Sequence, residues 1–203
     1  MALTPQQTDE LTELSNMAMS RAAKRLSILL NDEILLKVPK LEVLNPAEMA
    51  QLIQSQAEED AVCVYQDISR DLDGRLALLL PSQDSQELVH ALIGQGPEAE
   101  QFDLRALQHE AMTEIGNIIL SSCVELLTEL LNMVIDIRIP KYLQQDDIDQ
   151  LVDAESYPHV IVFHTHLEAV KRKIAGIIIL TLSMSSVHKL LESLDQLLRP
   201  NEQ

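Results

Sequence analysis

The sequence predicts an α/β protein of the α+β type, in which a unit of helix, strand, helix, strand, strand and helix occurs twice. Three observations lead to this prediction. Polar residues recur at an interval of 101 positions, half of the 203-residue chain. Each half begins with a long segment of helical periodicity and continues with alternating or continuous apolar segments. The chain is 46% hydrophobic but only 2% aromatic, so we expect a large aliphatic core.

The repeat divides the chain into residues 1–96 and 97–203, which we expect to form one domain with pseudo-two-fold symmetry. The residues repeated at the interval of 101 are Glu13 and Glu114, Asn16 and Asn117, and Pro39 and Pro140. With small insertions, the correspondence continues in 47–54 with 146–153, 61–69 with 159–167, and 74–80 with 176–182. The expected joint is GQGPEAE at 94–100. We expect the halves to share a mixed sheet and to present two long surface helices.

The first predicted helix runs from residue 5 to about residue 30. Thr4 can cap its N-terminus, and Pro5 suits the first helical position because its missing N–H is not needed there. Apolar residues then recur with helical spacing, at Leu11, Leu14, Ala18, Ala22 and Leu26. We expect this face to pack against the core.

Strand and turn signals predict the rest of the first unit. Residues 33–43 form a predicted strand in which Pro39 has no N–H to donate, so Pro39 belongs on an edge strand or at a strand end. The Asn45–Pro46 pair starts a short helix for the same capping reasons. A hairpin within 61–80 is predicted, because apolar segments flank the turn sequence DLDG. A helix near 82–93 closes the unit.

Charge and composition exclude several classes of function. Fifteen basic and thirty-two acidic residues give a net charge of −17, so nucleic acid would be repelled over most of the surface. Cys63 and Cys123 lie within apolar runs and are expected to be reduced core residues. The run at 174–182 has about half of the roughly 20 residues that a membrane helix requires. With no secretory signal evident, we expect a cytoplasmic protein without membrane insertion, and a monomer because one chain contains both halves.

Each long helix carries a polar stripe with the same spacing. At about 100° per residue, Asp9, Glu13 and Asn16 fall within about 60° of one another, opposite the apolar face. The equivalent residues of the second helix are Glu110, Glu114 and Asn117. A solvated face explains the carboxylates, which also favour a helix N-terminus. It does not explain the asparagines, because Asn has a lower helix propensity than Lys, Glu, Gln or Ala. The two triplets are therefore candidate functional residues.

The spacing of these residues resembles the motif of the CheC, CheX and FliY family of chemotaxis phosphatases. That motif is Asp or Ser, three residues, Glu, two residues, Asn, twenty-two residues and Pro. This chain contains it as Asp9, Glu13, Asn16 and Pro39, and again as Glu110, Glu114, Asn117 and Pro140, with twenty-two residues in both Asn-to-Pro gaps. Two copies in one chain resemble CheC, whereas CheX has one. Glu110 departs from the expected Asp or Ser, and the segment after Asn16 lacks glycines that relatives often have there.

The resemblance implies hydrolysis of the aspartyl phosphate on a CheY-like receiver domain of a chemotaxis response regulator. Asn16 and Asn117 would hold the attacking water, because a neutral amide can donate and accept hydrogen bonds. Glu13 and Glu114 would anchor the receiver through its lysine. Mg²⁺ is expected on the receiver, so this chain needs no metal or cofactor of its own. The alternative is a non-catalytic module that binds a receiver domain or a CheD-like deamidase.

Two other groups of side chains are weaker candidates. His164 and His166 lie two positions apart on a predicted strand and could share a metal, but no third ligand is evident. Ser121, Ser122 and Cys123 lie within the second long helix, without the glycine-flanked turn of a hydrolase nucleophile. The sequence therefore favours neither a metal centre nor a Ser or Cys hydrolase.

Overall fold

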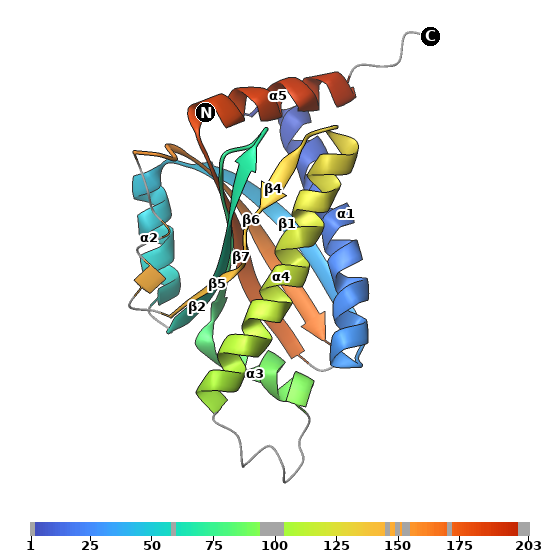
Figure 1. The fold of residues 1–203 in the computed structure, drawn as a ribbon, viewed down its shortest axis with the longest axis vertical. Helices are drawn as coiled ribbons and strands as arrows, with labels where there is room; N and C mark the ends of the chain where they lie inside the picture. Colours follow the sequence, from blue (N-terminus) through green and yellow to red (C-terminus); the bar gives the residue numbers. More distant parts are fainter. Residues whose placement is uncertain are drawn as a thin grey trace.

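A seven-stranded sheet separates the helices into two layers in the computed structural model (Figure 1). Helices α1 (Pro5–Leu30) and α4 (Leu104–Leu130) cover one face of the sheet, and α2 (Pro46–Ala57) covers the other. Helix α5 (Met184–Leu198) crosses one end of the molecule, and α3 (Ser82–Ile93) lies at the opposite end. The structure describes residues 3–57, 60–93, 104–144, 147–148, 151, 155–169 and 172–198.

The sheet is antiparallel throughout its described pairings. Its strands are β1 (Ile34–Leu44), β2 (Ala61–Arg70), β3 (Gly74–Pro81), β4 (Ile135–Ile137), β5 (Lys141–Gln144), β6 (His159–Ala169) and β7 (Arg172–Leu182). They pair in the order β1, β6, β7, β3, β2 and β4, and β5 also pairs with β2, always antiparallel. The predicted α+β class is confirmed. Strands from the two halves of the chain are interleaved in the sheet, so their order is mixed, but neighbouring strands are antiparallel in all described pairs. The pairs β2–β3 and β6–β7 are hairpins, which join antiparallel neighbours, and the pairings between the two halves are antiparallel as well.

Strands β3 and β7 pair at the centre of the sheet and connect the two halves of the chain. On one side, β1 from the first half pairs with β6 from the second. On the other side, β4 and β5 from the second half pair with β2 from the first. A two-fold axis between β3 and β7 would produce this order. The equivalence of repeats 1–96 and 97–203 itself stays a prediction from the sequence.

Helix α1 forms where the sequence predicts it. The Thr4 hydroxyl accepts a hydrogen bond from the Gln7 N–H at 3.2 Å, and the Gln7 side chain accepts one from the Thr4 N–H at 2.9 Å. Pro5 is the first helical residue. Asn31 ends the helix in the left-handed region, at a φ of 49°. The predicted core positions of this helix are all buried, namely Leu11, Leu14, Ala18, Ala22 and Leu26.

The other elements of the first half also match their predictions. Pro39 lies on the edge strand β1, where the register with β6 shifts, so its missing N–H interrupts no central ladder. Asn45 caps α2 by accepting a hydrogen bond from the Glu48 N–H at 2.9 Å. Strands β2 and β3 flank the predicted turn. The expected joint at 94–100, and most of the segment 146–153 that matches α2, lie outside the described residues.

The main core lies between the sheet and helices α1, α3, α4 and α5, and a smaller core lies under α2. Helices α1 and α4 pack together and run antiparallel, since Arg21 pairs with Glu129 and Arg25 pairs with Glu125, each at 2.7 Å. Exposed pairs of this kind contribute only about 0–1 kcal/mol each, so apolar packing holds the two helices together. Both motif-bearing helices therefore lie on the same face of the sheet. None of the helices in the described part of the chain combines the length and the apolar character that crossing a bilayer requires.

Candidate functional site

The four carboxylates of the two triplets project from α1 and α4 into solvent. Asp9 and Glu13 are exposed on α1, and Glu110 and Glu114 are exposed on α4. Within the described residues, none of the four has an ion-pair or hydrogen-bond partner. These carboxylates are therefore available to a cationic side chain of a partner protein.

Asn16 is half-buried, and its amide is engaged inside the molecule. Its Oδ1 accepts a hydrogen bond from the Val38 N–H at 2.8 Å. Its Nδ2 donates to the carbonyl oxygens of Val38 and Thr12, at 3.2 Å and 3.0 Å. Val38 directly precedes Pro39, so this contact joins α1 to β1 beside the proline of the first motif. Both N–H groups of the Asn16 amide are used, so Asn16 has no free donor for a water molecule.

Asn117 is also half-buried, but its amide is engaged differently. Its Oδ1 accepts hydrogen bonds from Gln66 Nε2 at 3.0 Å and from the Ser121 hydroxyl at 3.3 Å. These two bonds occupy both lone pairs of the oxygen. Its Nδ2 has no hydrogen-bond partner among the residues that the structure describes. Asn117 therefore keeps free N–H donors that Asn16 lacks.

Gln66 is a candidate site residue that the sequence motif does not include. It lies on β2, is 2% exposed, and donates from Nε2 to the Arg138 carbonyl at 3.1 Å as well as to Asn117. Arg138 lies two residues before Pro140. Gln66 therefore links the asparagine of the second motif to the segment that leads into its proline by hydrogen bonds to both. In the first motif, Asn16 contacts that segment directly. The one signal in the sequence is a glutamine directly after the apolar run AVCVY, which alone does not indicate its partner.

A close contact between α4 and β2 brings Gln66 and Asn117 together. Gly116 lies over Val64, and a Cβ at position 116 would be 2.6 Å from the Val64 Cβ. Real Cβ atoms do not approach so closely, so a glycine is what permits this separation of helix and strand. Gln66 follows Val64 by two positions and shares its face of the strand, while Asn117 follows Gly116. The glycine therefore sets the distance between the two amides.

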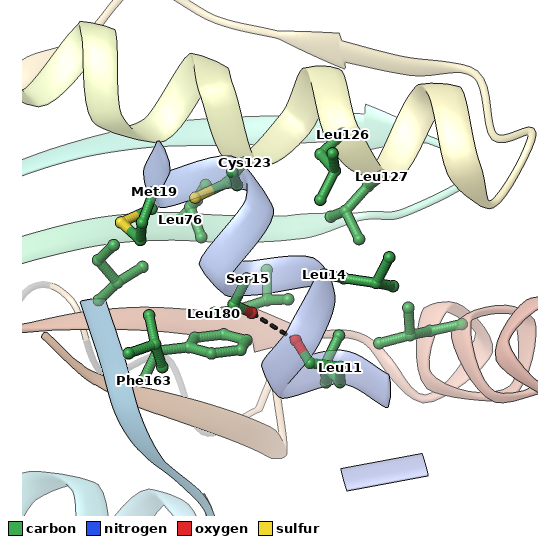
Figure 2. Close-up of a pocket in the computed structure, with 14 residues that line it drawn as sticks. Leu11, Leu14, Ser15, Met19, Leu76, Cys123, Leu126, Leu127, Phe163 and Leu180 are labelled. Atoms are coloured by element: carbon green, nitrogen blue, oxygen red, sulfur yellow. Dashed lines mark hydrogen bonds between the residues drawn. The ribbon is translucent and has the colours of Figure 1, made fainter. Parts of the chain in front are cut away.

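The corresponding position of α1 is Ser15, which lines a cavity in the core (Figure 2). The cavity has a volume of about 30 Å³ and lies between α1, α4 and the sheet. Its walls are almost entirely apolar, and Figure 2 shows Leu14, Leu126 and Leu127 among them. The Ser15 hydroxyl donates to the Leu11 carbonyl at 2.6 Å. The Ser15 hydroxyl is satisfied, and the described residues that line the cavity contribute no carboxylate or amide side chain, so the cavity is a gap in apolar packing.

The weaker candidates form no reactive centre in the described residues. His164 Nε2 lies 3.2 Å from a carboxylate oxygen of Glu42, and burial, together with the charge of Lys40, lowers the pKa of His164. No group of three or more His, Cys, Asp or Glu side chains within the described residues could hold a metal ion. Desolvation raises the pKa of Cys123 to about 12 and also raises the pKa of Cys63. Both thiols therefore stay protonated and are poor nucleophiles.

No protein-family model matches the sequence, but solved structures similar to this one cover most of the chain. FliY from Thermotoga maritima has a TM-score of 0.74 at 24% identity, over 97% of this chain and 99% of its own. A chain of the FliM–SpeE complex from H. pylori has a TM-score of 0.72 at 9% identity, over 96% and 97%. A chain of the CheX–CheY–BeF3–Mg²⁺ complex from Borrelia burgdorferi has 0.50 at 16% identity, over 81% and 96%. The chain therefore has a CheC/CheX/FliY-like fold, which confirms the fold that its motif resemblance implies.

Proposed function

We propose that this protein hydrolyses the aspartyl phosphate of a CheY-like receiver domain, and that Glu114 and Asn117 on α4 form its principal site. The motif and the fold suggest the reaction. One observation carries the choice of site. The amide of Asn117 has its oxygen held inside the molecule and its nitrogen free of partners in the described residues, whereas both N–H groups of Asn16 are used.

Docking in this proposal depends on the exposed carboxylates of α4. Glu114 lies about one helical turn before Asn117, so the two side chains share a face of the helix. Its free carboxylate can pair with the lysine beside the receiver's phosphoaspartate through a charge-assisted hydrogen bond. Glu110, one turn earlier, extends the same acidic surface. Such a pairing sets the register in which α4 enters the receiver's phosphate pocket.

The chemical step requires few catalytic groups from this chain, because the phosphoaspartate is an acyl phosphate and is already activated for hydrolysis. The receiver's own Mg²⁺ and lysine offset the charge on the phosphoryl oxygens. A water that accepts a hydrogen bond from Asn117 Nδ2 can direct a lone pair at phosphorus, in line with the aspartate oxygen. The new oxygen–phosphorus bond forms as the bond to the aspartate breaks. The products are the free carboxylate and inorganic phosphate, and the water's proton passes to phosphate or solvent.

In this proposal the first motif, on α1, contributes to binding of the receiver rather than to hydrolysis. Asn16 joins α1 to β1, and it would have to release Val38 or Thr12 before it could donate to a water. Glu13 remains exposed and without a partner in the described residues, so it can still contribute to docking. We therefore expect α1 to support binding of a receiver and α4 to carry out hydrolysis.

A non-catalytic binding module is the second candidate function. The engaged amide of Asn16 favours it, because α1 can present Asp9 and Glu13 to a partner without any free amide at the motif. The similarity to FliM also fits a binding role. The partner in this case would be a receiver domain or a CheD-like deamidase, regulated by occupancy alone.

The decay of phosphoaspartate on CheY-like receivers of the same organism tests both functions. Wild type is compared with Asn117→Ala, Asn117→Asp, Asn16→Ala and the double alanine variant, with and without a CheD-like partner. We expect wild type to accelerate decay, both Asn117 variants to lose the acceleration, and Asn16→Ala to keep most of it. Asn117→Asp is the matched variant, because it keeps the side chain's size but replaces the free donor with a carboxylate oxygen. Binding without acceleration of any receiver by wild type would instead support the binding module.

A further inference from the structure

We propose that Gln66 is a positioning residue for Asn117 and determines that the amide nitrogen, rather than the oxygen, faces the receiver. The inference rests on the proposed function and adds a residue that lies outside the motif. Gln66 is 2% exposed, so it acts through Asn117 and does not touch the receiver itself. Its contacts fix first the orientation of its own side-chain amide and then that of the Asn117 amide.

The orientation starts from a backbone group. The carbonyl oxygen of Arg138 can only accept a hydrogen bond, so the Gln66 atom 3.1 Å from it is the donor Nε2. This contact selects one of the two ways in which the Gln66 amide can be turned. The alternative would place the Gln66 oxygen against the Arg138 oxygen, and two acceptors repel each other.

The same nitrogen then orients Asn117. Gln66 Nε2 lies 3.0 Å from the Asn117 side chain, and a donor nitrogen requires an acceptor there, which is Oδ1. The Ser121 hydroxyl, 3.3 Å away, donates to the same oxygen. A turned Asn117 amide would place its NH2 group against that of Gln66. Asn117 therefore presents Nδ2 outward before any partner arrives, and no reorganisation is needed during the reaction.

The burial of Gln66 supports a role beyond packing. Its Oε1 is buried and has no hydrogen-bond partner among the described residues. A buried acceptor without a partner is destabilising, and a Leu or Met at this position would avoid that penalty. The presence of glutamine at this position is explained by its Nε2, which donates hydrogen bonds to both the Arg138 carbonyl and Asn117 Oδ1. The first motif contains no such link in the described residues, because Asn16 bonds directly to the backbone of Val38.

The first test is Gln66→Leu, assayed for hydrolysis of a phosphorylated receiver. We expect kcat to fall about 10- to 100-fold, because a misdirected amide misplaces the water, while KM stays unchanged. Thr165→Val is the matched control: Thr165 is a buried polar residue on β6, which β7 and β3 separate from β2. Equal losses in both variants, or a change in KM alone, would overturn the inference.

The second test is Gln66→Glu, assayed across about pH 6 to pH 9, where buried glutamic acids titrate. The protonated acid can still donate to Asn117 Oδ1, whereas the ionised carboxylate repels it. We expect kcat of the variant, relative to wild type at each pH, to fall as pH rises. A constant ratio over this range would count against positioning by a donor at residue 66.

A third measurement separates failure of this inference from failure of the proposed function. The NMR chemical shift of the Asn117 side-chain carbonyl carbon reports the hydrogen bonds to Oδ1 without any substrate. We expect this shift to move in Gln66→Leu and to stay in place in Thr165→Val. An unmoved shift overturns the positioning role. A moved shift in a protein that hydrolyses no receiver overturns the phosphatase and leaves the amide orientation standing.

Discussion

Asn16 and Val38 share two hydrogen bonds, one in each direction. The Val38 N–H donates to Asn16 Oδ1 at 2.8 Å, and Asn16 Nδ2 donates to the Val38 carbonyl at 3.2 Å. The pair joins the middle of α1 to the edge strand β1, next to Pro39 and to the register shift between β1 and β6. The asparagine of the first motif thus has a structural contact with the backbone, whereas the Asn117 side chain bonds only to the side chains of Gln66 and Ser121 among the described residues.

We predict that Asn16→Ala lowers the free energy of unfolding by about 1–3 kcal/mol, because the backbone groups of Val38 lose their side-chain partners. Urea denaturation measures the change. Ser20→Ala is the control, since this exposed hydroxyl bonds within its own helix, to the Asn16 carbonyl, and to no other residue in the described part of the chain. An Asn16→Ala protein of wild-type stability that no longer accelerates phosphoaspartate decay would contradict the assignment of roles.

We predict that Gly116→Ala destabilises the protein, although alanine is favoured over glycine in a helix by about 1 kcal/mol. The added Cβ would lie 2.6 Å from the Cβ and Cγ1 of Val64, so α4 must move away from β2. Overpacking of this kind costs about 1–3 kcal/mol, and the shift also separates Asn117 from Gln66, so kcat falls. Denaturation and receiver dephosphorylation measure the two effects.

The Val64→Ala background provides the control for this prediction. Removing Cγ1 and Cγ2 of Val64 gives the new methyl group some of the space it needs, so Gly116→Ala should cost less in that background. The double-mutant cycle reports a favourable coupling between positions 64 and 116. Additive losses would show that the two residues do not determine the separation of α4 from β2.

We predict that Glu114→Lys weakens binding of the receiver by about 10-fold or more, because it replaces an attractive charge at the docking surface with a repulsive one. The same change at Glu13 should have a smaller effect, since α1 only supports docking in this proposal. Binding is measured by titration with a receiver carrying a phosphoaspartate mimic, and Glu114→Gln is the size-matched control. Equal effects at the two glutamates would argue for two equivalent sites.

We predict that Asp71 contributes stability that disappears in acid. A hydrogen bond from Lys189 on α5 and one from the Val134 N–H, at 2.7 Å, lower the pKa of Asp71. Because the folded pKa lies below the unfolded one of about 3.9, the contribution is complete above that pH and is lost as pH falls through the folded value. Asp71→Asn should be less stable than wild type at neutral pH, and the difference should shrink below about pH 4. Thermal unfolding over this range checks it, and a difference independent of pH would contradict it.

Local signals account for the elements that the sequence predicts correctly. Thr4 and Pro5 start α1, the apolar residues of α1 at helical spacing face the core, and the DLDG turn lies between β2 and β3. Each of these features depends on residues a few positions apart, so propensity and periodicity are sufficient to recognise them. The relative direction of β2 and β3, and of β6 and β7, follows from their hairpins, but the order of the strands and the direction of the other pairs depend on contacts between the halves.

By itself, the sequence determined the fold class, the two long helices and the positions of the polar stripes, because periodicity places residues on a face without reference to any other element. Only the tertiary structure decided what the two asparagines do. Asn16 meets Val38 across 22 positions and Asn117 meets Gln66 across 51, and the second contact exists because Gly116 lets α4 approach β2 closely. Hydrogen-bond capacity is finite, so the partner that folding supplies determines whether an amide nitrogen is used up or left free.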